Sequence, residues 1–128
     1  MLKRILPALL LPLILAGCAT SFTNLTPSQQ TRTTNNVYSV EVEFVSNQQS
    51  LRWDSIRPQI LVGSQSYDMR STPLMNNRWE GQILVPASSD KVTYRYRFDY
   101  DYNSFGKPKA DTALSPEYIL RIRPEQPK

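Results

Sequence analysis

Side chains that could do chemistry are few in this chain. Cys18 is the one cysteine among 128 residues, and there is no histidine. These counts exclude an intrachain disulfide, zinc or haem held by histidine, and any catalytic triad with an imidazole base. Carboxylates, arginines and aromatic rings remain, and each group has a chemical and a structural interpretation.

One set of side chains with oxygen ligands has a spacing typical of a metal site. Asp99, Asp101 and Asn103 have the spacing that opens a calcium loop. However, Ser104 replaces the turn glycine, and Ala110 replaces the glutamate of the twelfth position. Alternation on one strand face explains the spacing without a metal. We therefore expect no metal and no other cofactor, and the three residues remain a calcium candidate.

Two carboxylate pairs could in principle cleave a glycosidic bond. They are Asp54 with Glu80, and Asp99 with Asp101. A domain of this size leaves little room for a substrate cleft. We expect no enzyme activity.

Four arginines are expected on the water-facing side of neighbouring strands: Arg95, Arg97, Arg121 and Arg123. One interpretation is a solvated face paired with acidic residues, namely Glu41, Glu43, Asp99 or Asp101. Exposed pairs of this kind add little stability. The other interpretation is a patch for phosphate headgroups, lipopolysaccharide-type anions or an acidic partner.

Aromatic residues could stack against a sugar ring. The candidates are Trp53, Tyr102 and Phe105, together with Tyr100. Trp53 falls in the polar stretch 48–54, which predicts a loop. Aromatic residues spaced by two, however, are usually buried in a core, so both interpretations stay open.

The chain begins with a pattern typical of secretory signals. Lys3 and Arg4 precede an apolar run at 5–16, which is shorter than the roughly 20 residues of a membrane-spanning helix. The run ends in Leu15-Ala16-Gly17-Cys18. In these residues the chain resembles bacterial lipoproteins, whose lipobox has this form.

The resemblance to lipoproteins implies cleavage after residue 17 and a diacylglyceryl group on the Cys18 sulfur. Ala19, rather than aspartate, follows the cysteine, which implies transport to the outer membrane. The sequence does not encode which side of the outer membrane the protein faces. Two or three acyl chains make a stable anchor.

Residues 18–36 are rich in Thr, Ser, Asn and Gln, with a single charge at Arg32. Such a composition predicts a flexible tether, because it buries too little surface to offset the entropy of ordering. Alternatively, Phe22 and Leu25 dock on the domain or on a partner. Residues 125–128 are expected to form a short tail.

From Val37 onward the apolar pattern has a period of two. Strands are predicted at 37–44, around 56–62, near 67–69, at 79–85, 91–102 and 117–123, with a long loop at 103–116. Pro58 predicts that its strand is an edge strand or begins late. No segment has a helical period.

Six or seven strands over residues 37–124 predict an all-β fold, a small antiparallel β-sandwich. Strand count and spacing resemble immunoglobulin-like and fibronectin-III-like domains. The run from Arg78-Trp79 to Pro86, followed by Val92 to Asp99, is also similar to carbohydrate-associated immunoglobulin-like modules. Trp79 and Tyr94 are the leading core candidates.

Charge does not indicate a nucleic-acid partner. The full chain carries 15 basic and 11 acidic residues, and loss of residues 1–17 removes two of the basic ones. The sequence therefore predicts a lipid-anchored, non-catalytic interaction or scaffold module with a protein partner in the cell envelope. A carbohydrate-binding module is the alternative.

Overall fold

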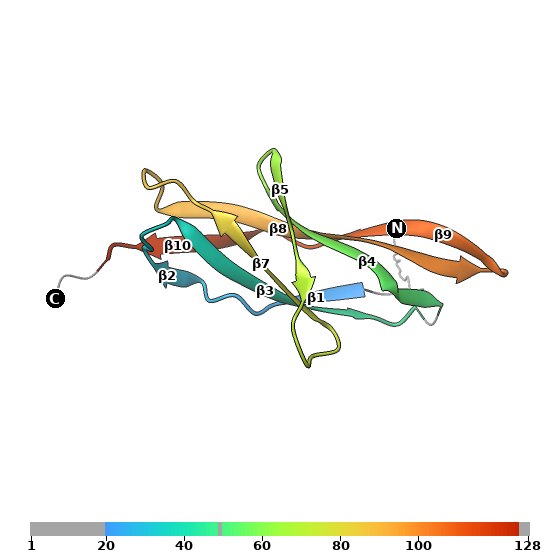
Figure 1. Ribbon diagram of the computed structural model, residues 1–128. Coiled ribbons are helices and arrows are strands. Elements are labelled where there is room, and N and C mark those ends of the chain that lie inside the picture. Colours follow the sequence, from blue (N-terminus) through green and yellow to red (C-terminus); the bar gives the residue numbers. More distant parts are fainter. Residues whose placement is uncertain (1–19, 49, 126–128) are drawn as a thin grey trace, which may run out of the picture.

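The computed structural model describes residues 20–48 and 50–125. Ten strands occupy most of this part of the chain (Figure 1). In chain order they are β1 (Thr20–Asn24), β2 (Gln29–Thr31), β3 (Val37–Ser46), β4 (Leu51–Val62), β5 (Gln65–Asp68), β6 (Arg70–Ser71), β7 (Arg78–Leu84), β8 (Lys91–Ser104), β9 (Lys107–Leu114) and β10 (Tyr118–Arg123).

The strands form two sheets. The first has the order β1-β3-β7-β6, and the second has the order β2-β10-β8-β4-β5, with β9 also paired to β8. All pairs are antiparallel except β2 with β10. These orders match the two sheets of an immunoglobulin domain. β5, at the edge of the second sheet, matches the additional strand of variable-type domains. The predicted all-β, immunoglobulin-like sandwich is confirmed.

The core lies between the sheets and follows the period of two. On β3 the residues Tyr38, Val40, Val42 and Phe44 are buried, and on β8 four successive alternate aromatics are buried: Tyr94, Tyr96, Phe98 and Tyr100. The rings of Phe44 and Phe98 join the two sheets, with centroids 4.7 Å apart. Trp79 and Tyr94 are both buried, which confirms them as core residues.

The prediction of a tether at 18–36 is wrong for the described residues. β1 pairs with β3 from Thr20 opposite Ser46 to Asn24 opposite Val42, and β2 pairs with β10. Phe22 docks on the domain, as the alternative had it, with its ring 5.1 Å from that of Phe44. A polar edge strand needs only one inward aromatic, so its composition resembles that of a disordered segment. The folded domain includes β1 and β2, so its predicted start at Val37 is wrong.

A buried polar network fixes the segment that crosses from β1 to β2. The Tyr96 hydroxyl donates to Asn24 Oδ1 at 2.7 Å and lies 3.2 Å from the Thr26 hydroxyl. Thr26 Oγ1 also accepts from the backbone N–H of Glu41 at 2.8 Å. The side chains of Asn24 and Thr26 thereby anchor the crossover to both sheets.

The predicted loop at 103–116 is also wrong. β8 continues to Ser104, and a two-residue turn with positive φ at Phe105 and Gly106 leads into β9. Ser104 and Lys107 close the turn, and the pair that closes such a turn is hydrogen-bonded. The next pair, Asn103 with Pro108, is therefore not hydrogen-bonded, so the Pro108 nitrogen points away from β8. A proline is tolerated there. Its presence, with Gly106, gave the segment the appearance of a loop.

Strand β4 starts earlier than predicted. It begins at Leu51, and its register against β8 shifts between Arg52 and Arg57. β4 lies between β8 and β5, and the Pro58 carbonyl accepts from the Met69 N–H at 3.2 Å on the β5 side. The prediction from Pro58 of an edge strand or a late start is therefore wrong. Trp53 also lies on this strand, and its predicted placement in a loop is wrong.

Candidate functional site

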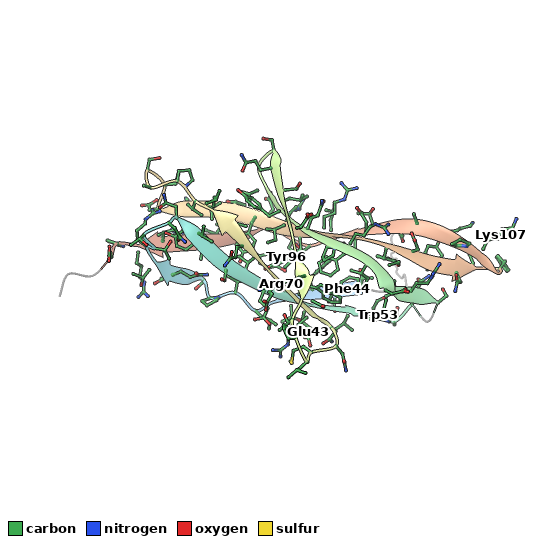
Figure 2. The ribbon with its side chains drawn as sticks, in the orientation of Figure 1. Glu43, Phe44, Trp53, Arg70, Tyr96 and Lys107 are labelled. Carbon is green, nitrogen blue, oxygen red and sulfur yellow. The ribbon has the colours of Figure 1, made fainter. Side chains whose placement is uncertain are left out.

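Trp53 is the one predicted sugar-stacking residue that lies at a hollow in the surface. Its ring is parallel to that of Trp79, with centroids 6.2 Å apart and planes at 7°. Phe44 meets it edge-on at 6.3 Å. Trp79 and Phe44 are buried, whereas Trp53 remains 45% exposed. The core thus holds one face of the Trp53 indole, and Figure 2 shows Trp53 near Phe44.

The hollow beside Trp53 has a volume of about 480 Å³. Its lining combines apolar and amide side chains from β3, β4 and the turn before β7: Phe44, Val45, Ser46, Trp53, Asn76 and Asn77. The backbone carbonyl of Asn77 accepts from the Phe44 N–H at 3.0 Å, which fixes the turn against β3. A flat ring surrounded by amides suits the apolar face of a sugar or the boundary between acyl chains and headgroups.

The other two predicted stacking residues lie elsewhere. Tyr102 is partly buried and packs against the core. Phe105 occupies the tip of the β8–β9 hairpin and is fully exposed. Val45, Asn76 and Asn77 were not predicted as site residues, because the asparagine pair is equally typical of an ordinary turn.

The four predicted arginines share the second sheet but do not form one cluster of ion pairs. Arg95 and Arg97 lie on β8, and Arg121 and Arg123 on β10. Arg97 Nε contacts Asp99 Oδ1 at 3.1 Å. Within residues 20–48 and 50–125, the other three arginines of the set make no ion pair.

The expected acidic partners of these arginines are only partly correct. Glu41 and Glu43 belong to β3 in the other sheet, so their predicted pairing with this face is wrong. Burial alone would raise the pKa of Asp99, but the hydrogen bond from Thr112 and the Arg97 guanidinium outweigh it. They hold the pKa of Asp99 below its ordinary value.

The calcium candidate lies along β8. Asp99 is bonded to Arg97, and Asp101 contacts Arg57 at 3.5 Å. The spacing of Asp99, Asp101 and Asn103 is therefore that of alternate residues on one strand. In the described part of the chain, no three acidic, histidine or cysteine side chains are grouped as a metal site would require.

The glycosidase pairs do not face each other across a cleft. Asp54 lies on β4 and Glu80 on β7, in different sheets. Glu80 also lines a groove of about 800 Å³ over β3 and β7, where Arg70 holds its carboxylate at 3.1 Å.

Cys18, the expected lipidation site, lies outside the described residues. Within residues 20–48 and 50–125, no helix has the length and apolar character to cross a bilayer.

No family model and no curated protein matches the chain. Solved structures with similar folds include murine CRIg, at 12% identity and a TM-score of 0.42, covering 82% of this chain and 98% of that one. AggA, the major subunit of aggregative adherence fimbriae type I of Escherichia coli, has 7% identity and a TM-score of 0.44, with 87% and 97% covered. A DUF4785 family protein of Legionella pneumophila has 6% identity and a TM-score of 0.48, with 84% and 29% covered.

The strand order places the protein among immunoglobulin-like β-sandwich domains.

Proposed function

We propose that this chain is a bacterial lipoprotein whose immunoglobulin-like domain is a non-catalytic interaction module of the cell envelope. Acyl chains on Cys18 hold it at the outer membrane, and a protein partner binds the folded domain. The observation that carries the proposal is the sequence Leu15-Ala16-Gly17-Cys18, after a positive flank and a short apolar run. A cysteine sulfur is the one side-chain atom in the chain suited to this alkylation.

Two features of the folded domain support an adaptor rather than an enzyme. The carboxylates considered for hydrolysis are either separated between sheets or held by arginine, as for Glu80 and Asp99. Arg121 and Arg123 are exposed on β10, and among the described residues neither makes an ion pair. A positive surface of this kind suits an acidic partner, which it would attract in a salt-dependent way.

Metabolic labelling with palmitate tests the anchor. The wild-type chain incorporates label and sediments with membranes, and the Cys18→Ser chain does neither. Equal labelling of the two chains contradicts the proposal.

Crosslinking in cells followed by capture of the chain tests the interaction module. We expect one protein to be recovered in stoichiometric amount, and Arg121→Glu with Arg123→Glu to lose it. A charge reversal at Arg52, an exposed residue on β4 that β8 separates from β10, keeps it. If no stoichiometric protein is recovered from wild type, the adaptor role is wrong.

Carbohydrate binding is the second candidate function, favoured by the exposed face of Trp53 beside Asn76 and Asn77. A glycan array with the Cys18→Ser chain checks it. Loss of signal on Trp53→Ala, but not on Phe105→Ala, places the sugar in the hollow. No signal from the parent chain excludes this function for the sugars on the array.

A further inference from the structure

The chain reaches the folded domain at a defined place. Thr20 pairs with Ser46 and Ser21 with Val45, at the end of β3. Cys18 precedes Thr20 by two residues, and two extended residues span at most about 7 Å. An acylated Cys18 therefore holds this end of the first sheet close to the bilayer, because β1 leaves no room for a long tether.

Exposed apolar side chains gather around the same place. Val45 and Trp53 are each 45% exposed and line one hollow with Asn76 and Asn77. Two further large apolar side chains come directly before those asparagines: Leu74, fully exposed, and Met75, 40% exposed. We call Val45, Trp53, Leu74 and Met75 the apolar face. In Figure 1 the β6–β7 turn that carries Leu74 projects on the side of the sandwich that carries β1 and β3.

Backbone conformation gives a second, independent observation. Leu74 has φ of 65° and Phe105 has φ of 52°. A bulky side chain in this left-handed region is uncommon, and glycine or asparagine is the usual choice for a turn. Both residues are nevertheless fully exposed at turn tips. Two turns thus display a large apolar side chain at a backbone cost, without burying it in the domain.

We propose that the apolar face rests on the phospholipid bilayer that holds the acyl chains of Cys18. The inference rests on the proposed lipidation of that cysteine. Indole rings favour the boundary between acyl chains and headgroups, which places Trp53 at that depth with Asn76 and Asn77 among the headgroups. Leu74 and Met75 enter the acyl region beside it.

The β8–β9 hairpin supplies a second contact. Its tip lies beyond the start of β4, toward the same end of the molecule as the start of β1 (Figure 1). Phe105 at the tip is followed by Lys107 and Lys109, which suit anionic headgroups. Three sites of contact, at Cys18, the apolar face and the hairpin tip, would fix the orientation of the domain and leave the arginines of β10 free for a partner.

A bilayer fits this surface better than a soluble sugar does. A sugar held in the hollow beside Trp53 gives no role to Leu74 or Phe105 at projecting tips. A bilayer accepts projecting apolar side chains, and the short connection from Cys18 brings it to this end of the domain.

The test uses the full lipoprotein, purified from membranes and reconstituted into vesicles of phosphatidylethanolamine and phosphatidylglycerol. A nitroxide label is attached through Leu74→Cys or Phe105→Cys. Leu84→Cys is the matched control, because Leu84 is an exposed leucine at the opposite end of β7, where it pairs with Val37. Relaxation by oxygen, which concentrates in lipid, is compared with relaxation by a water-soluble nickel chelate. Quenching of tryptophan emission by brominated lipid is a second measurement, and the Trp53→Phe chain, which keeps only the buried Trp79, shows how much of the quenching belongs to Trp53.

We expect the ratio of oxygen to nickel relaxation to be severalfold higher at positions 74 and 105 than at 84, and Trp53 to be quenched. Mass spectrometry first establishes that Cys18 is acylated. In such protein, equal relaxation ratios and no quenching overturn the bilayer contact and leave the anchor intact. Absence of the acyl chains overturns the proposed function and this inference with it. A Trp53 fluorescence change with soluble oligosaccharide but not with vesicles assigns the face to sugar and also overturns the inference.

Discussion

Replacing Trp79 by alanine should cause a large loss of stability in the aromatic core. The ring lies edge-on to Phe98 at 5.2 Å and to Phe44 at 6.3 Å, and it supports Trp53 from below. Burying a tryptophan removes about 150–250 Å² from water. At about 25 cal/mol per Å², this corresponds to about 4–6 kcal/mol as an upper estimate.

We therefore expect Trp79→Ala to lower the free energy of unfolding by about 3–5 kcal/mol, the range found for large-to-small changes in cores. With a urea dependence of about 2 kcal/mol per M, the unfolding midpoint falls by about 2 M. Circular dichroism during urea titration measures it. Trp53→Ala, at a half-exposed ring on the same stack, is the control and should cost about half as much. A Trp79→Ala midpoint within about 0.5 M of wild type, a change of about 1 kcal/mol, would refute the core placement.

Other predictions follow from the buried network and from one glycine. Tyr96→Phe removes the bond to Asn24 and should cost about 1–3 kcal/mol in a urea titration, because Asn24 loses a buried partner; no change would show that the network does not stabilise the crossover. Burial raises the pKa of Tyr96 above its ordinary value of 10.0. The stability from the neutral hydroxyl is therefore fully present below about pH 10 and is lost as the pH rises further. In thermal melts over the same pH range, the Tyr96→Phe chain should lose less stability than wild type. Gly81→Ala places a methyl group 2.9 Å from Ile60 Cδ1 and 3.1 Å from the Asp68 carbonyl oxygen; it should lower stability by about 1–3 kcal/mol, and a melt equal to wild type would show that β5 can move aside.

The sequence predicts the central strands because their burial is regular. β3 and β8 each have one face toward the other sheet, so apolar residues recur at every second position. Trp79 and Tyr94 follow from the same alternation. These strands lie in the interior of their sheets, where period and burial agree.

The peripheral strands escape sequence reasoning for a different physical reason. β1 and β2 are short edge strands with mostly polar residues, and their pairing depends on distant partners in β3 and β10. β9 is exposed at seven of eight positions, so it has no apolar pattern to detect. Pro108 and Gly106 are also compatible with a loop, and only the register against β8 shows that they fit a hairpin.

The candidate site was predictable only in part. The lone Trp53 in a polar stretch pointed to an exposed aromatic residue, but its neighbours Val45 and Asn76 come from other strands and turns. Their proximity depends on the pairing of β3 with β7 and on the packing of the two sheets. Local sequence does not contain this information.

Intact-mass spectrometry of the protein purified from membranes tests the central claim most directly. A lipid-anchored sandwich predicts a chain that begins at Cys18 and carries a diacylglyceryl group on sulfur, with an acyl group on the new amine. A mass equal to the unmodified chain, with or without residues 1–17, would contradict it.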